Sequence, residues 1–164
     1  GAAIAVQMAY DHPRFIKRAV LSGPPLLSVD QVNGLRASLQ AIRIADDGGH
    51  LVQVWERIRK RDSALALEIV HREVLLTQSA RDAAQGTYQA VFDQPFGEQL
   101  AVLEIPILVM AGENDTLRAS LEPAHKLLRN GEMRVIVGEG AYICDTNPQA
   151  VAEILKSFLR SETC

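Results

Sequence analysis

Asp115 is the residue best placed to do chemistry, because it follows the uninterrupted strand pattern of 106–111 and the turn residue Gly112. A continuous apolar run after a proline predicts a buried parallel strand that ends in a sharp turn. In open α/β sheets, ligands and catalytic groups gather at the carboxyl ends of such strands. A carboxylate at that edge can orient a base that activates a nucleophile. The structural alternative is that Asp115 caps a helix predicted from Leu117.

His50 and Ser22 are further candidates for a pocket or a base. His50 adjoins Gly49 at the start of a predicted helix, where it either roofs a pocket or lies on the surface. Ser22 ends a predicted strand and opens the breaker cluster 22–25, so it either lines the site or belongs to the turn. The other histidines are predicted to be structural, at a helix end or within packed helices: His12, His71 and His125.

Other motifs with known chemistry do not occur in the sequence. It has no P-loop, no Gly-x-Gly-x-x-Gly after a strand, and no spacing typical of metal ligands. We therefore expect no cofactor and no metal. The two cysteines, Cys144 and Cys164, form no disulfide framework. Their number and spacing suit a reducing compartment and predict a cytoplasmic protein.

The composition is that of an ordinary soluble protein. Of the 164 residues, 48% are hydrophobic and 23% are charged, which suits one domain with at most a subdomain. The formal net charge of -3 gives no electrostatic footprint for nucleic acid or an anionic membrane. The basic run 57–61 is predicted to be a solvated helix face. No apolar run approaches the roughly 18 residues that a membrane span needs.

Two segments of the chain show strands alternating with helices. A helix over the first nine residues ends at Asp11-His12-Pro13, and a strand is predicted at 18–21. Later, the strand at 106–111 precedes a helix at 117–128, with Pro123 inside it. A strand at 133–137 precedes a last helix that Asn147 caps. This alternation predicts an α/β fold with a parallel sheet and right-handed crossovers.

The middle of the chain, residues 26–94, carries only helical patterns. Four segments show apolar residues at helical spacing, and no strand pattern interrupts them. The first stripe consists of Val32, Leu35, Leu39 and Ile42, and the third helix is predicted at 64–76. This block is predicted to be an all-helical insertion between two strands of the sheet.

At this point the sequence resembles the C-terminal part of an α/β-hydrolase-fold protein. Residues 1–9, followed by His12-Pro13 and the segment 18–23, are similar to the stretch after the nucleophile elbow, a Gly-x-Ser-x-Gly motif whose last glycine would be Gly1. The segment 105–115 is similar to the strand that carries the catalytic acid. Residues 138–140 and the helix from Asn147 resemble the histidine loop and the closing helix. The order and spacing of these motifs extend the resemblance over essentially the whole chain.

The resemblance implies a partial α/β-hydrolase core with three parallel strands at 1–25 and 95–164, and a helical cap or lid at 26–94. Asp115 stands in the place of the triad acid. The nucleophile would lie two residues before Gly1, and both oxyanion-hole donors would also precede the chain. Where the family has its histidine, this sequence has Ala141 followed by Tyr142. Neither side chain replaces an imidazole at neutral pH, although Tyr142 is a candidate for the pocket.

Two functions remain open on the sequence alone. In one, the full-length protein hydrolyses an ester or a similar small molecule, with Asp115 as the acid and His50 as the least unfavourable base. In the other, the protein is a non-catalytic relative or a ligand-binding module. The expected partner in either case is a small molecule, whereas the identity of the substrate and the oligomeric state stay open.

Overall fold

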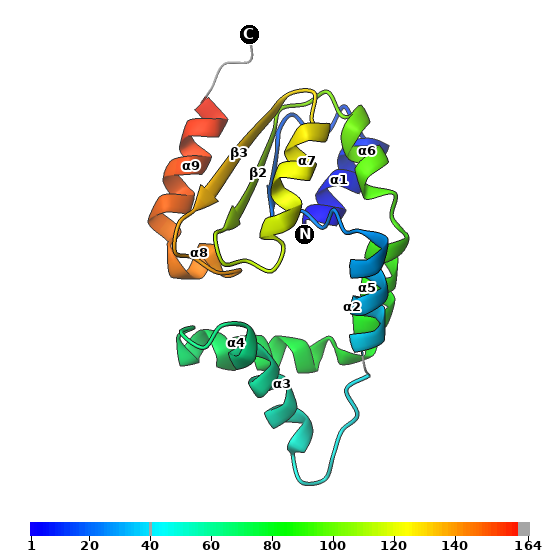
Figure 1. Ribbon diagram of the computed structural model, residues 1–164, viewed down its shortest axis with the longest axis vertical. Coiled ribbons are helices and arrows are strands. Elements are labelled where there is room, and N and C mark those ends of the chain that lie inside the picture. Colours follow the sequence, from blue (N-terminus) through cyan, green and yellow to red (C-terminus); the bar gives the residue numbers. More distant parts are fainter. Residues whose placement is uncertain (40, 161–164) are drawn as a thin grey trace. The chain divides into compact units, whose positions relative to one another are not determined.

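The computed structural model describes residues 1–39 and 41–160, so that Cys164 lies outside the described residues (Figure 1). The chain divides into two compact units. The first consists of Gly1–Leu27 together with the chain from Gln94 onward, and the second is Ser28–Asp93.

A parallel sheet with the strand order β1-β2-β3 forms the centre of the first unit. Its strands are β1 (Ala19–Ser22), β2 (Ile107–Gly112) and β3 (Gly131–Ile136). In register, Ile107 of β2 lies opposite Ala19 of β1 and Gly131 of β3. The three predicted parallel strands are therefore confirmed, with boundaries that shift by no more than two residues.

β2 is buried along its whole length, because helices cover both faces of the sheet. Ile107 and Val109 point into one apolar cluster, whereas Leu108 and Met110 point into the other, as the two-residue period of a strand requires. Burial of each such side chain contributes about 1.5–3 kcal/mol. Figure 1 shows the helices of the first face, which are α1 (Ala2–Asp11), α6 (Phe96–Val102) and α7 (Leu121–Leu127). The other face carries α8 (Ile143–Thr146) and α9 (Pro148–Arg160).

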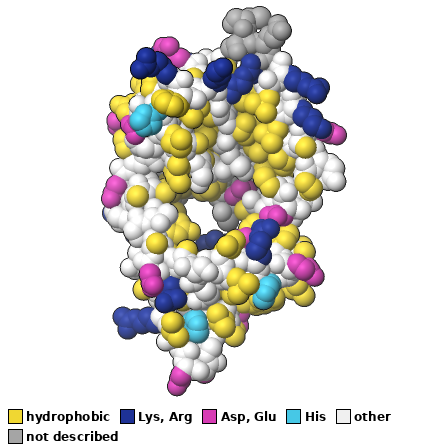
Figure 2. Space-filling model, turned by 180° about the vertical axis from the view of Figure 1, so that it is seen from behind, with side chains coloured by type: hydrophobic (Ala, Val, Ile, Leu, Met, Phe, Trp, Pro, Cys, Tyr) yellow, Lys and Arg dark blue, Asp and Glu magenta, His cyan; other side chains and the backbone are white. Residues whose placement is uncertain are grey.

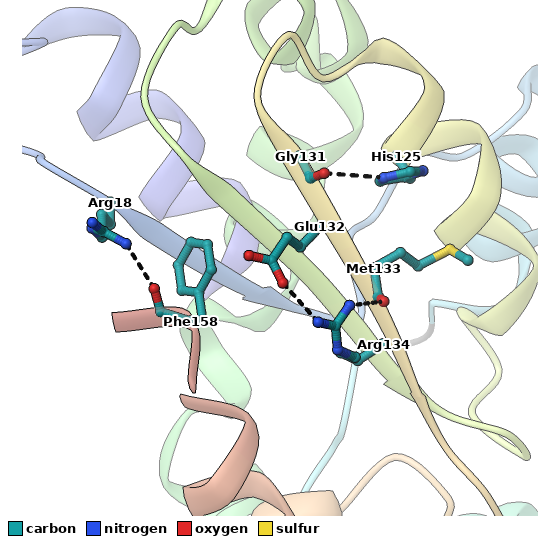
Figure 3. Close-up of polar contacts among 7 residues, drawn as sticks. All are labelled: Arg18, His125, Gly131, Glu132, Met133, Arg134 and Phe158. Atoms are coloured by element: carbon teal, nitrogen blue, oxygen red, sulfur yellow. Dashed lines mark hydrogen bonds and ion pairs between the residues drawn. The ribbon is translucent and has the colours of Figure 1, made fainter. Parts of the chain in front are cut away.

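Hydrogen bonds hold α9 near both of its ends. Asn147 Oδ1 accepts a hydrogen bond from Ala150 N–H at 3.2 Å, so the predicted N-cap is confirmed. Near the other end, Arg18 Nη1 donates to Phe158 O at 2.7 Å, as Figure 3 shows. The Arg18 guanidinium also lies over the Phe158 ring, 5.8 Å from its centroid. The residue before β1 therefore fixes a helix that is 140 positions away in sequence.

The predicted helix at 117–128 is shorter than expected and has two parts. Arg118–Ser120 forms a 3₁₀ turn, and α7 follows it over Leu121–Leu127. Pro123 lies in the first turn of α7, where its missing N–H leaves no intrahelical hydrogen bond unmade. Sequence reasoning also missed the short helices α6 and α8.

A chain of glutamine side chains joins α6 to α1. Gln99 is buried, and its Nε2 donates to Gln7 Oε1 at 2.7 Å. Gln94 Nε2 donates to Gln99 Oε1 at 2.6 Å and to Ala3 O at 3.0 Å. These bonds satisfy an amide that would otherwise be costly to bury. On its outer side, α1 leaves Ile4 and Met8 exposed.

The second unit is helical. Its described helices are α2 (Val29–Ser38), α3 (Gly49–Arg61), α4 (Leu67–Ser79) and α5 (Arg81–Asp93). Ser28 and Gln31 start α2 with a reciprocal capping box. α3 and α4 pack together through buried valine and isoleucine side chains, at Val54, Ile58, Val70 and Val74.

Two of the predicted helix boundaries in this unit are wrong. α2 ends at Ser38, and Leu39 has an extended backbone, so the stripe from Val32 to Ile42 does not continue as a helix. Val32, the first residue of this stripe, is half-buried. α4 begins at Leu67 rather than at residue 64, because the side chain of Asp62 accepts a hydrogen bond from Ala64 N–H and holds a turn there.

Candidate active site

Asp115 lies just beyond the carboxyl end of β2, as its sequence position predicts. Its Oδ1 accepts a hydrogen bond from Leu117 N–H at 2.8 Å, and its carbonyl accepts one from Arg118 N–H at 2.9 Å. The side chain is half-buried. The carboxylate therefore starts the 3₁₀ turn with one oxygen and has a second oxygen for another partner.

The second oxygen of Asp115, Oδ2, faces the end of β1. Gly23 follows Ser22, and its N–H donates to Met110 O at 2.9 Å. A Cβ built on Gly23 would lie 3.4 Å from Asp115 Oδ2, and the φ of Gly23 is +60°, a conformation that favours glycine. Ser22 is exposed at the same edge. The structure thus brings Ser22 and Asp115, two predicted site residues, to neighbouring strand ends.

The loop after β3 is hydrogen-bonded to the loop that carries Asp115. Asn114 N–H donates to Glu139 O at 2.8 Å, and Gly138 N–H donates to Glu113 Oε2 at 2.9 Å. The two backbones approach so closely at Gly112 that a Cβ there would overlap the carbonyl oxygens of Glu139 and Gly140. Gly112 is therefore required for the contact between the two loops.

Ala141 and Tyr142 directly follow Gly140 in the loop after β3. Ala141 is exposed, so that a methyl group stands where the resemblance places an imidazole. Tyr142 is half-buried and precedes α8, and its carbonyl accepts a hydrogen bond from Asp145 N–H at 2.8 Å. The loop that precedes both residues is hydrogen-bonded to the loop that carries Asp115.

Both histidines of the first unit lie at the opposite edge of the sheet. His125 Nε2 is 3.3 Å from the carbonyl oxygen of Gly131, the first residue of β3 (Figure 3). His12 follows α1 ahead of β1, and its ring contacts Phe15. The six residues of β2 separate the two edges of the sheet by about 20 Å. Neither histidine is therefore placed to serve Asp115.

His50 lies in the second unit, near the start of α3. Its Nδ1 accepts a hydrogen bond from Ala45 N–H at 3.2 Å, and its carbonyl accepts one from Gln78 Nε2 at 3.1 Å. Because the Nδ1 lone pair is engaged, the neutral ring carries its proton on Nε2. In this arrangement the imidazole has no second lone pair with which to act as a base.

An ion pair that sequence reasoning missed lies next to the loop that carries Asp115. Arg118 Nη2 is 2.7 Å from Glu122 Oε1. The hydrogen bond from Arg118 lowers the pKa of Glu122, and the same bond, with a smaller contribution from Glu113, raises the pKa of Arg118. The i,i+4 spacing of the pair was the signal that could have revealed it. Across the described residues there is no group of three His, Cys, Asp or Glu side chains that could hold a metal ion.

Solved structures share this arrangement of strands and helices over nearly the whole chain. A hydrolase from Pseudomonas aeruginosa PA01 matches 98% of the chain with a TM-score of 0.75 at 22% identity. A bromoperoxidase from Bacillus anthracis matches 96% with a TM-score of 0.74 at 16% identity. MenH from S. aureus matches 98% with a TM-score of 0.73 at 19% identity. The chain has an α/β-hydrolase fold.

The α/β-hydrolase fold is represented in part. The chain spans 62% of the Pseudomonas hydrolase, 63% of the bromoperoxidase and 65% of MenH. No protein-family model and no curated protein matches the sequence. The likeness is therefore one of fold.

Within the α/β-hydrolase fold, the predicted site residues separate into two groups. Asp115, Ser22 and Tyr142 belong to the carboxyl ends of the sheet and the loops after them, whereas His50 belongs to the helical unit. Sequence reasoning missed Gly23 and the contact at Gly112, because both depend on segments far apart in the chain. None of the helices in the described residues is both long and apolar enough to cross a membrane.

Proposed function

We propose that the full-length protein hydrolyses an ester or a similar small molecule, with Asp115 as the acid that orients the catalytic base. The observation that carries this proposal is the position of the Asp115 carboxylate at the carboxyl edge of an α/β-hydrolase sheet. One oxygen of the carboxylate is held by Leu117 N–H, and the other faces the end of β1. A carboxylate held in this way can fix the tautomer of an imidazole and stabilise its cation.

The remaining catalytic groups are assigned by the resemblance. The nucleophile is expected two residues before Gly1, at the elbow, and the oxyanion-hole donors are expected in preceding segments. The exposed end of β1 at Ser22 would line the same pocket. In this mechanism the residues from Gly1 onward supply the acid, Asp115, and part of the pocket wall, at Ser22.

The proposed mechanism also needs a base. Ala141 stands at the position of the usual histidine, and His50 is the candidate from the sequence. For His50 to act as a base, it would have to release the Ala45 N–H and present a free lone pair.

The helical segment 26–94 is proposed to be the cap of the hydrolase. Its insertion between β1 and β2 and its exclusively helical described elements support this assignment. The cysteine usage supports a cytoplasmic location. The small net charge supports a small-molecule substrate rather than nucleic acid.

The second candidate is a non-catalytic relative that binds a small molecule. Ala141 is the specific observation that favours it, because a triad without a base cannot activate a serine. Labelling with a fluorophosphonate, which reacts with activated serines, distinguishes the two candidates in a protein that includes the residues before Gly1. We expect covalent labelling two residues before Gly1 and none after heat denaturation. An unlabelled native protein would favour the second candidate.

A further inference from the structure

β3 has one open side in the described sheet, because β2 pairs with its other side and no further described strand pairs with it. Asn130 O accepts a hydrogen bond from the first residue of β2 at 2.9 Å, and Ile136 O accepts one from the residue after β2 at 3.0 Å. Backbone groups alternate in direction along a strand, so the even-numbered residues of 130–136 bond to β2. The N–H and C=O groups that point to the open side therefore belong to Gly131, Met133 and Val135.

Side chains contact two of the carbonyl oxygens on the open side of β3, as Figure 3 shows. His125 Nε2 lies 3.3 Å from Gly131 O. Arg134 Nη1 donates a hydrogen bond to Met133 O at 2.8 Å. Because a carbonyl oxygen has two lone pairs, both oxygens can accept a further bond from another strand. The open side of β3 can therefore pair with another chain and extend the sheet.

Glu132 and Arg134 add a pattern of charge to this strand. The register places Glu132 beside Leu108 and Arg134 beside Met110, and both of these β2 residues face the apolar cluster under α9. The two charged side chains therefore lie on one face of β3. They form an ion pair of 2.8 Å between Arg134 Nη2 and Glu132 Oε2, and both stay partly exposed. Each charge is thus accessible to a strand that pairs with the open side.

A second copy of β3, running antiparallel, matches both the backbone groups and the charges. When Met133 lies opposite Met133 of the second copy, the two residues exchange their N–H and C=O bonds. In the same register, Glu132 of each copy lies opposite Arg134 of the other. These are the pairs without backbone bonds, in which the side chains approach most closely. Opposite charges at such positions stabilise the pairing of two strands.

The charges also disfavour the neighbouring registers. A shift by two residues in one direction keeps the backbone bonds but places Glu132 opposite Glu132 of the second copy. The same shift in the other direction places Arg134 opposite Arg134. Like charges that lie directly opposite each other destabilise a strand pair. The pattern is therefore complementary to itself about Met133, which favours a second copy of this chain over an unrelated strand.

We propose that the open side of β3 is a homodimer interface, in which two copies of β3 pair antiparallel with Met133 at the twofold axis. All the residues that carry the proposal belong to the first unit, and none of them takes part in the proposed hydrolysis. A contact that uses the same surface on both subunits closes at two copies. Because the paired segment is short, the dimer is weak and its population depends on concentration.

Reversal of one charge tests the interface by sedimentation of the 164-residue chain. Every chain in the experiment also carries Ile4→Lys, because the exposed Ile4 of α1 offers another surface for association. The chain without further changes should show an equilibrium between monomer and dimer. Glu132→Arg should raise the dissociation constant roughly tenfold, because an arginine would face Arg134 of the second copy at two positions. Arg134→Glu should have the same effect.

Mixtures test the register, with one of the two chains fluorescently labelled. Chains with Glu132→Arg should dimerise with chains that carry Arg134→Glu, because opposite charges face each other again. The double variant Glu132→Arg/Arg134→Glu should dimerise with itself but not with the unreversed chain, since that mixed dimer would align like charges. The control is Glu56→Arg, the same change of charge at an exposed residue of α3, and it should leave the dimer unchanged.

The double variant keeps the composition and net charge of the chain, so it tests the register even where a single reversal lowers the melting temperature. Monomers at every concentration would overturn the proposal. A single reversal that acts no more strongly than Glu56→Arg would also overturn it. So would free mixing of the double variant with the unreversed chain, because it would show that Glu132 and Arg134 do not face each other across the interface.

Discussion

At the scale of single residues, the site depends on close approaches between two loops and one strand end. Gly112 lets the backbone of 139–140 come into contact with β2, and Gly23 lies beside the Asp115 carboxylate. The carboxylate has both a local partner, Leu117 N–H, and an open side. The Asp115 side chain thus holds the turn before the 3₁₀ helix with one oxygen, and its other oxygen faces Gly23.

Gly112→Ala should destabilise the protein by about 1–3 kcal/mol, because its Cβ would overlap the carbonyl oxygens of two residues in the next loop. Urea unfolding measures the change in the free energy of unfolding. Gly86→Ala is the control, since open space surrounds a Cβ there inside α5. This control should raise stability by up to about 1 kcal/mol through helix propensity. Equal effects of the two variants would show that the loop contact at Gly112 is not tight.

The Arg118–Glu122 pair should give a pH-dependent contribution to stability. Because the hydrogen bond from Arg118 lowers the pKa of Glu122 in the folded state, the contribution is fully present above the unfolded pKa of 4.5. It disappears as the pH falls through the lower folded pKa. The difference in melting temperature between the wild type and Glu122→Gln should therefore shrink from pH 6 to pH 3. A difference that stays constant over this range would contradict the ion pair.

At the scale of elements, the strands were predictable and several helix boundaries were not. The run at 107–112 is apolar at every position because both faces of β2 are covered, and such runs are recognisable without tertiary information. α6 and α8 are too short for a periodic pattern, having seven and four residues. α2 ends at Ser38, although the apolar stripe in the sequence continues to Ile42. The position of Asp115 followed from its strand, whereas its contact with Gly23 required the fold.

β1 is an edge strand of the described sheet, and α1 beside it leaves Ile4 64% exposed and Met8 47% exposed. Apolar side chains are also visible on the molecular surface in Figure 2. Unpaired edges and exposed apolar faces promote association. We expect the chain of 164 residues to self-associate with increasing concentration in sedimentation experiments. Ile4→Lys should reduce this association, whereas Val137→Lys, at a side chain that is 77% exposed after β3, should not. A monodisperse wild-type monomer would contradict the expectation.

At the scale of the whole molecule, the chain combines part of an α/β-hydrolase sheet with a helical unit. Asp115 lies at the carboxyl edge of the sheet, and both histidines of the unit that contains the sheet lie at the amino edge. The proposed hydrolysis therefore requires a nucleophile, oxyanion-hole donors and a base from segments other than the strand end that carries Asp115.

The 164-residue chain by itself should not hydrolyse an activated ester, because the nucleophile and the oxyanion donors are assigned to preceding residues. The measurement is the release of nitrophenol from a nitrophenyl ester, with heat-denatured chain as the control. Saturable turnover that disappears on denaturation would contradict this assignment and would place a complete site within the chain.

The most direct test of the account is the turnover of the full-length protein carrying Asp115→Asn. The amide oxygen of asparagine can still accept the hydrogen bond from Leu117 N–H, so the melting temperature should remain close to that of the wild type. Turnover should fall by about 10⁴-fold, because an amide neither fixes the productive imidazole tautomer nor stabilises its cation. Asp46→Asn, at an exposed carboxylate of the helical unit, should change neither quantity. Near-normal turnover of Asp115→Asn would show that Asp115 only holds the turn before the 3₁₀ helix and would contradict its role as the acid.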